Sequence, residues 1–291
     1  MDKTTGESFE HRREWVEKRL LAVSSVFSID VASFAIMSNH YHVVLHVDTS
    51  TAAEWTDIDV IKRWHRLFNG SLLSRKFLDC PNLLSPGEIG YVRELANQWR
   101  HRLTDISWFM RCVNEPISRQ ANAEDRCTGA FWEGRFKSQA LLDEKAILAA
   151  MAYVDLNPIR AEMATTPDDS DHTSIQRRVA AAREGRVPQE LMCFQVRSHD
   201  DKPSAIPCSL EHYVKLLDWT GRAVQSGTRG AIDDGQPPLL HRIKMDAAKW
   251  LAVATEFEDQ FRQWVGTDIA IQTAARNVGK TRSRSPPLIA A

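Results

Sequence analysis

The sequence predicts a mixed α+β fold, and three observations support this prediction. Two runs rich in Val, Ile and Phe, at residues 29–37 and 41–48, have the composition of β-strands. Residues 8–24 carry apolar side chains at roughly helical spacing, and so do residues 91–122. Two or three further helical patterns fall within residues 210–265. Helices therefore outnumber strands in the predicted fold.

The segments between these elements are assigned from the same signals. Residues 51–69 are expected to be helical, and residues 71–90 are expected to form a loop because proline and glycine interrupt them. Pro116 marks a kink or a restart in the helical region around it. A candidate strand then runs from Ala130 to Leu142.

A helix is predicted directly after this strand. Asp143 is a suitable N-cap, and Glu144 lies in the first turn, where a negative charge is favourable. Because a proline disfavours helical geometry in the residue before it, the helix is expected to end near Asn157-Pro158. Residues 173–183 are predicted to form the next helix.

Composition indicates a water-soluble chain without a membrane span. The 291 residues are 43% hydrophobic and 26% charged, and no apolar run approaches the roughly 20 residues that cross a bilayer. The polar start shows no secretory signal. The five cysteines are scattered, with no Cys-x-x-Cys pair, which predicts the reducing cytoplasm rather than a disulfide framework.

Charge is distributed unevenly along the chain, although the net charge is only −1. Residues 60–140 hold 13 Lys and Arg against 8 Asp and Glu, whereas residues 1–59 hold 5 against 10. The basic segment also contains aromatic residues, namely Trp64, Trp99, Trp108, Phe109, Phe131, Trp132 and Phe136. This mixture suits phosphates and unstacked bases. The alternative is a set of core aromatics beside a solvated arginine face.

His40 and His42 form the most informative local pattern. Residues two apart on a strand point to the same face, so both imidazoles would project side by side. Such a pair can hold one divalent metal ion and leave positions open for a substrate oxygen. A His-x-His pair on a strand is more often structural. His46 lies about 13 Å beyond His42 on a straight strand, and we interpret it as a surface or packing residue.

Tyr153 and Asn157 supply a second candidate pair. They lie four residues apart and therefore share one helical face. A tyrosine hydroxyl can attack phosphorus when a cation activates the phosphate, and an asparagine carbonyl oxygen is a hard metal ligand. Taken separately, each residue is more often structural.

Three separated motifs in fixed order change this assessment. They are Asn39-His40-Tyr41-His42, the run from Gly129 to Ser138 (Gly-Ala-Phe-Trp-Glu-Gly-Arg-Phe-Lys-Ser), and the run from Ala152 to Ala161 (Ala-Tyr-Val-Asp-Leu-Asn-Pro-Ile-Arg-Ala). In this order the motifs resemble the single-tyrosine HUH transposases, particularly the REP-associated tyrosine transposases in their long form with a C-terminal extension. The resemblance covers roughly residues 8–165.

The resemblance implies a fold and a set of catalytic roles. The implied fold is a ferredoxin-like HUH domain, an antiparallel sheet flanked by helices, followed by a mainly helical extension. His40 and His42 match the two HUH histidines, Tyr153 matches the nucleophile, and Asn157 matches the third metal ligand, with Mg²⁺ or Mn²⁺ as the cofactor. Tyr153 would attack single-stranded DNA, form a 5′-phosphotyrosine and release a 3′-hydroxyl. The implied partner is a DNA hairpin, with the protein a monomer or homodimer associated with the nucleoid.

Four basic residues are candidates for DNA contacts. Arg135 and Lys137 alternate with Phe136 on the candidate strand and can contact phosphate, although a structural ion pair is equally compatible with the pattern. Arg160 follows Asn157 closely enough in sequence to approach the site. Arg111 could line a groove, the alternative being a solvated helix face.

The motifs predict a division of the chain. We assign 1–165 to the transposase domain, 166–209 to a linker with a short helix, 210–279 to a helical extension and 280–291 to a disordered tail. Compared with the family, the N-terminal strand before residue 8 is expected to be missing, which would leave a sheet edge exposed.

Two other functions are compatible with the same residues. A catalytically inactive relative would bind DNA hairpins without cleaving them. A metal-dependent hydrolase would use the His pair to activate water and would leave no covalent protein–DNA adduct.

Overall fold

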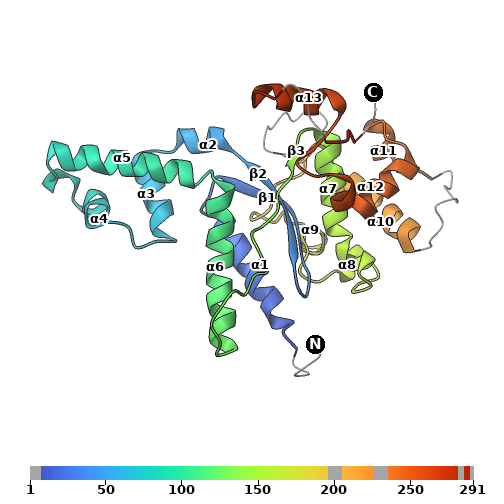
Figure 1. The fold of residues 1–291 in the computed structure, drawn as a ribbon, viewed down its shortest axis with the longest axis horizontal. Coiled ribbons are helices and arrows are strands. Elements are labelled where there is room, and N and C mark those ends of the chain that lie inside the picture. Colours follow the sequence, from blue (N-terminus) through green and yellow to red (C-terminus); the bar gives the residue numbers. More distant parts are fainter. Residues whose placement is uncertain (1–7, 196–204, 226–234, 281–284, 289–291) are drawn as a thin grey trace. The chain divides into compact units, whose positions relative to one another are not determined.

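A computed structural model describes residues 8–195, 205–225, 235–280 and 285–288. Over these residues the protein is a mixed α+β structure in which helices predominate (Figure 1). The predicted α+β class is therefore confirmed. The chain forms two compact units, one of residues 1–31 with 45–135 and one of residues 32–44 with 136–291. Within the described ranges, no helix is both long and apolar enough to cross a bilayer.

The first unit is built mainly from helices. These are α1 (His11–Ser24), α2 (Thr49–Glu54), α3 (Asp57–His65), α4 (Leu72–Asp79), α5 (Pro86–Arg102) and α6 (Ile106–Glu124), with a short 3-10 helix, η1 (Pro81–Leu83). The helix expected over residues 51–69 is two helices, because Trp55 has extended backbone geometry and Thr56 caps the second one. The loop expected over residues 71–90 instead contains α4 and the start of α5.

Side-chain caps explain why these two helices begin where they do. The side chains of Ser71 and Ser85 each accept a hydrogen bond from the backbone N–H three residues later. In return, the backbone N–H of each serine donates to the side chain of that later residue, Ser74 or Glu88. Pro86 occupies the first turn of α5, where a missing N–H has no cost. Pro116 does not interrupt α6, which continues through it.

Two strands, β1 (Ile29–Ile36) and β2 (Tyr41–Val47), form a two-stranded antiparallel sheet, close to the expected bounds. The Met37 N–H donates to the carbonyl oxygen of His40 at 2.9 Å and closes the turn between them. In the second unit, the Ile36 N–H donates to the carbonyl oxygen of His172 at 3.0 Å. Residues 172–173 thus cover the last part of the free edge of β1.

The strand expected from Ala130 to Leu142 is reduced to β3 (Ala140–Leu141), which pairs in parallel with β4 (Trp264–Val265). Residues 133–138 are all exposed, so they present no apolar face that a sheet could bury. The aromatic and basic residues in this segment therefore do not give a strand.

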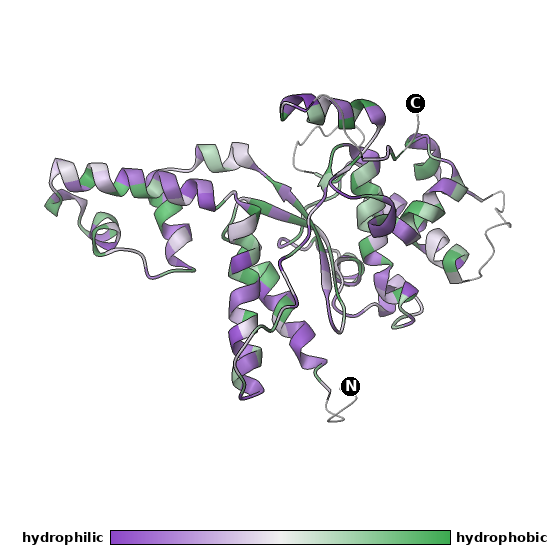
Figure 2. Ribbon diagram, in the orientation of Figure 1, coloured by the Kyte–Doolittle hydropathy of each residue, from purple (hydrophilic) through white to green (hydrophobic). Residues whose placement is uncertain are grey.

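The second unit surrounds one apolar helix. Its helices are α7 (Glu144–Asp155), α8 (Asn157–Arg160), η2 (Pro167–Asp169), α9 (Ser174–Arg183), α10 (Leu210–Gln225), α11 (Pro238–Arg242), α12 (Ala247–Gln260) and α13 (Asp268–Asn277). Hydrophobic residues run along most of α7 (Figure 2), and nearly all are buried. α12 packs along α7, while α10 packs against α8, α11 and α12. Helices α10, α11 and α12 therefore share one core with α7, whereas the buried residues of α13 pack with Trp264.

A buried polar network holds the end of α7. The Asp155 carboxylate accepts hydrogen bonds from the hydroxyls of Ser174 at 2.6 Å and Tyr213 at 2.7 Å. The nearby guanidinium of Arg178 is also buried and donates to the carbonyl oxygen of Ala32 at 2.9 Å. Burial raises the pKa of Asp155 and raises the pKa of Tyr213 well above its ordinary value. The network joins α7 to β1, α9 and α10.

Part of the predicted disordered tail is ordered. Leu288 is buried, and its N–H donates to the carbonyl oxygen of Gly266 at 2.8 Å. Residues 281–284 and 289–291 of the tail, and residues 196–204 of the predicted linker, lie outside the described residues.

Candidate active site

His40 and His42 lie side by side in the second unit. His40 is exposed and directly precedes β2, and His42 is the second residue of that strand. Their ring centres are 4.9 Å apart, with the ring planes 80° to one another. The Nδ1 atom of His40 lies 2.7 Å from the side-chain oxygen of Asn39. Alternation along the strand therefore places the two imidazoles on one surface, as the sequence indicates.

Tyr153 lies against His42. Their ring centres are 5.6 Å apart and the planes meet at 79°, an edge-to-face arrangement. Tyr153 is near the end of α7, which begins where Asp143 accepts a hydrogen bond from the Ala146 N–H at 2.9 Å, as predicted. Packing of β2 and α7 in one core brings these two residues together although they are far apart in sequence.

Arg160 covers the Tyr153 ring. Its guanidinium carbon lies 3.7 Å from the centre of that ring. The same guanidinium donates to the carbonyl oxygens of Ala254 at 3.0 Å and Thr255 at 3.1 Å. Burial raises the pKa of Tyr153, and the positive charge of Arg160 partly opposes this effect. The phenol is therefore protonated at neutral pH.

His42 is held neutral. Burial lowers its pKa to about 4, and the charges of His40 and Arg160 act in the same direction. A carboxylate oxygen of Glu258 lies 3.1 Å from His42 Nδ1. An ion pair would need a charged imidazole, but the side chain is only 15% exposed, so burial dominates and the contact joins a carboxylate to a neutral ring. A neutral imidazole retains the lone pair that a metal ion needs.

Asn157 begins α8, one turn beyond Tyr153, and is buried. Its side-chain amide makes no hydrogen bond to another residue that the structure describes. Pro158 occupies the first turn of α8 and limits how the chain continues from α7. The amide oxygen of Asn157 is thus not committed to another described residue.

The three predicted metal ligands, His40, His42 and Asn157, are of chemical types that suit a divalent cation. Their two imidazoles and one amide oxygen would make a mixed N/O set of the kind that accepts Mn²⁺ or Mg²⁺ with open positions. Among the residues with described positions, no three His, Cys, Asp or Glu side chains are grouped closely enough to hold a metal ion. Metal binding at His40, His42 and Asn157 therefore stays a prediction.

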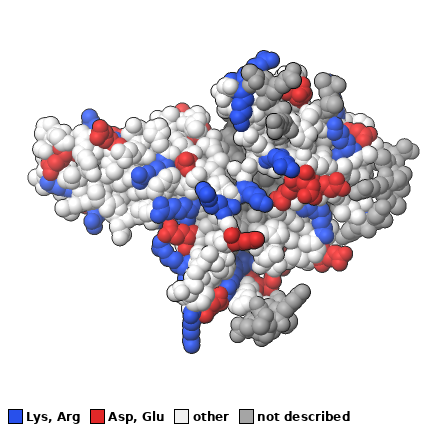
Figure 3. Space-filling view, viewed as in Figure 1, with Lys and Arg blue, Asp and Glu red and all other residues white. Residues whose placement is uncertain are grey.

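The remaining predicted DNA contacts are distributed over both units. Arg111 belongs to the first unit, where it pairs with Glu115 at 3.1 Å on the exposed face of α6. Arg135 also belongs to the first unit, whereas Lys137 belongs to the second, and both side chains are exposed. Figure 3 shows basic and acidic side chains interspersed over the face in view.

Two site residues were not predicted from the sequence. Phe257 lies with its ring centre 5.7 Å from that of Tyr153, and Glu258 contacts His42. The apolar pattern around Phe257 indicates only that this segment is helical. No motif in the sequence connects α12 to Tyr153.

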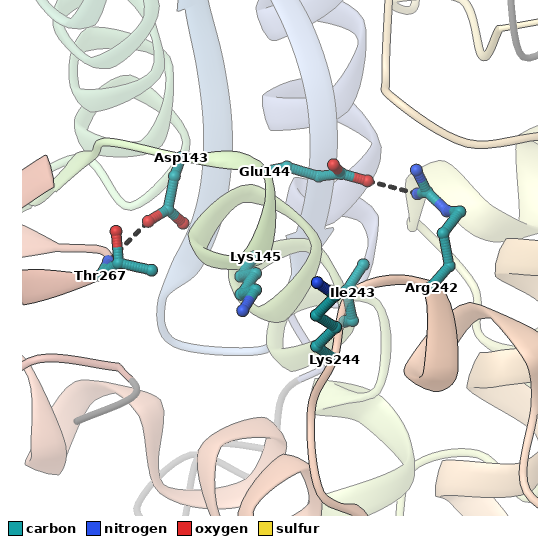
Figure 4. Close-up of a pocket in the computed structure, with 7 residues that line it drawn as sticks. All are labelled: Asp143, Glu144, Lys145, Arg242, Ile243, Lys244 and Thr267. Carbon is teal, nitrogen blue, oxygen red and sulfur yellow. Dashed lines mark hydrogen bonds and ion pairs between the residues drawn. The ribbon is translucent and has the colours of Figure 1, made fainter. Parts of the chain in front are cut away.

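A shallow hollow at the start of α7 is separate from these residues. It is lined by Asp143, Glu144, Lys145, Arg242, Ile243, Lys244 and Thr267 (Figure 4). Glu144 pairs with Arg242, and Asp143 accepts a hydrogen bond from the Thr267 N–H, so these charges serve the packing of α7. The hollow does not include the His pair or Tyr153.

Comparison with known proteins yields no match to a family model, to a curated protein or to a solved structure.

Proposed function

We propose that the protein is a metal-dependent single-strand DNA transposase that cleaves and rejoins hairpin DNA through Tyr153. The observation that carries the proposal is the ring contact between His42 and Tyr153, which unites two motifs that are separate in sequence. The order of the motifs, their resemblance to the single-tyrosine HUH transposases and the α+β character of the chain also support it. On this proposal β1 and β2 belong to an HUH-type sheet of ferredoxin-like topology.

The proposed reaction exchanges one phosphodiester for another. The phenolic oxygen of Tyr153 forms a bond to phosphorus, and the bond from phosphorus to the 3′ oxygen breaks. The products are a 5′-phosphotyrosine and a free 3′-hydroxyl, and the phenolic proton ends on that hydroxyl by way of solvent. Attack by a second 3′-hydroxyl reverses the step, so rejoining needs no external energy source.

The described residues have definite roles in this scheme. His40, His42 and Asn157 would hold Mg²⁺ or Mn²⁺, and the ion would neutralise charge on a non-bridging phosphate oxygen. His42 can serve at neutral pH because its low pKa leaves it uncharged. Arg160 lies on Tyr153 and counteracts part of the burial effect on the phenol.

An adduct assay tests the proposal. The full-length protein is incubated with labelled single-stranded hairpin DNA and Mn²⁺, and denaturing gels and mass spectrometry detect a covalent species. We expect an adduct at Tyr153 that chelation, Tyr153→Phe and His42→Ala each abolish. Tyr91→Phe changes an exposed tyrosine of the first unit and serves as the matched control.

Two alternative outcomes correspond to the two competing functions. Hairpin binding without cleavage would identify an inactive DNA-binding relative, which the raised pKa of Tyr153 would also suit. Cleavage that survives Tyr153→Phe and leaves no adduct would identify a hydrolase that activates water. Either result would overturn the role of Tyr153 as the nucleophile.

A further inference from the structure

The C-terminal end of α12 contacts three residues of the candidate site. It supplies two backbone carbonyls to Arg160, the ring of Phe257 to Tyr153 and the carboxylate of Glu258 to His42. All these groups belong to the second unit. The contacts come from four residues between positions 254 and 258, so they do not depend on a single side chain.

A kink in α12 accompanies these contacts. Glu256 has non-helical backbone angles, φ −122° and ψ 26°, inside the helix. In a regular helix each carbonyl accepts from the N–H four residues later. Kinks occur where another group inserts into this ladder, and here the guanidinium of Arg160 donates to the carbonyls of Ala254 and Thr255 directly before the kink.

Arginine suits this position because two requirements meet there. A planar guanidinium can lie over an aromatic ring and donate hydrogen bonds at the same time. Arg160 does both, with the Tyr153 ring 3.7 Å from its central carbon and the two α12 carbonyls as acceptors. A lysine ammonium has neither the plane nor the fork. Phe257, which is 4% exposed, adds a further ring contact to Tyr153.

We propose that Arg160 is a positioning residue for Tyr153 and that the kinked end of α12, residues 254–257, is its anchor. The proposal rests on the nucleophile role proposed for Tyr153. On this proposal, part of the C-terminal extension contributes to DNA strand cleavage, although the extension carries no catalytic motif. Reaction rates depend steeply on the alignment of the attacking atom, and a displacement of about 1 Å can cost about 100-fold.

Kinetics of the full-length protein test this role. Single-turnover adduct formation and hairpin dissociation constants are measured for wild type, Arg160→Ala, Arg160→Lys and Phe257→Leu. We expect Arg160→Ala to slow adduct formation about 100-fold at saturating DNA while affinity changes little. Added ethylguanidinium should restore part of the rate, and Arg160→Lys should not. Weaker hairpin binding with an unchanged rate at saturating DNA would identify Arg160 as a DNA contact and overturn the proposal.

A control variant and a second readout keep the result interpretable. Arg222→Ala removes an arginine of α10 that pairs with Asp218, and its rate should match wild type. Fluorine NMR of protein containing 3-fluorotyrosine, assigned with Tyr153→Phe, reports the ring directly among only 4 tyrosines. In Arg160→Ala we expect the Tyr153 signal to change its chemical shift because the ring averages over several orientations. In Phe257→Leu we expect a smaller change in chemical shift.

The fluorine spectrum also separates the two proposals. If wild type forms no adduct, the nucleophile role fails, while the spectrum still measures whether Arg160 holds the ring. A Tyr153 signal that is identical in wild type and Arg160→Ala would overturn the positioning role whether or not the adduct forms. If Arg160→Ala does not fold, the same measurements are made on Phe257→Leu, which retains most of the apolar volume at that position.

Discussion

The rings of His42 and Tyr153 meet edge to face, with their centres 5.6 Å apart. Burial shifts the pKa of both groups away from the charged form, downward for the imidazole and upward for the phenol. At neutral pH both rings are therefore uncharged. The contact therefore joins two neutral aromatic rings. A charge that develops on either ring must be stabilised by a neighbouring charged or polar group.

Stability should fall in acid because of His42. Its pKa is about 4 in the folded protein and about 6.5 when exposed, so the unfolded chain takes up the proton first as pH falls. The stabilisation is complete above pH 6.5 and is lost progressively down to about pH 4. Urea unfolding of wild type and His42→Asn should show a relative loss for wild type of about 3 kcal/mol at most over this range.

An exposed histidine provides the comparison for this effect. His212 lies exposed on α10 of the same unit, so His212→Asn should follow the wild-type curve. Parallel curves for wild type and His42→Asn would show that the imidazole is not buried as described.

The buried network at Asp155 should contribute measurably to stability. Tyr213→Phe removes the hydroxyl that donates to Asp155 at 2.7 Å and leaves a carboxylate oxygen in a buried position without that donor. We expect the free energy of unfolding to fall by about 1–3 kcal/mol, measured by urea titration. Tyr91→Phe, at a side chain that is 53% exposed, should change it little. Equal effects of the two substitutions would contradict the network.

The C-terminal helices should be needed for the second unit to fold. A chain that stops at residue 209 lacks α10 and α12, which would leave the apolar surface of α7 open to water. We expect this fragment to aggregate or to lose its cooperative thermal transition, measured by size-exclusion chromatography and near-ultraviolet circular dichroism. A monomeric fragment with a sharp transition would show that residues up to 209 form an independent domain.

The predicted DNA contacts should differ in their salt dependence. The side chains of Arg135 and Lys137 are exposed and make no ion pair with a described residue. If each contacts one phosphate, its replacement by alanine should lower the slope of log affinity against log salt by about 0.7–0.9. Arg111 already pairs with Glu115, so Arg111→Ala should change the slope less.

A matched substitution away from these positions keeps the salt comparison specific. Arg186 is exposed and pairs with Glu184, and Arg186→Ala should leave the slope unchanged. A uniform decrease for all four variants would indicate a general charge effect and no defined phosphate contacts.

Local signals in the sequence predicted the elements that carry the first and third motifs, but not the structure of the motif at residues 129–138, which forms no strand. The strand pair, the Asp143 cap and the end of the helix before Pro158 all depend on neighbouring residues, and each agrees with the structure. The starts of α4 and α5 were missed although Ser85-Pro86-Gly87-Glu88 is a readable capping box. Proline and glycine in this stretch indicate a loop, whereas Ser85 and Glu88 indicate a helix start, and the structure follows the serine and the glutamate.

The parts of the site that were not predicted depend on long-range packing. The sequence relates Arg160 to the site only through its position after Asn157, because its partners Ala254 and Thr255 are 94 and 95 positions away in sequence. Nothing local distinguishes these carbonyls, or Phe257, from others in an amphipathic helix. Their role depends on which helix packs along α7, and the hydrophobic pattern does not specify that choice.

The separation between Arg160 and its anchor has a consequence during synthesis on the ribosome. The carbonyls that fix Arg160 are made long after α7 and α8 have been translated, so Tyr153 emerges before its complete surroundings exist. At about 5–20 residues per second, this interval lasts on the order of 5–20 seconds. On the proposed mechanism, a nascent chain therefore carries an unaligned tyrosine, and strand cleavage begins only once the C-terminal helices have been translated and folded.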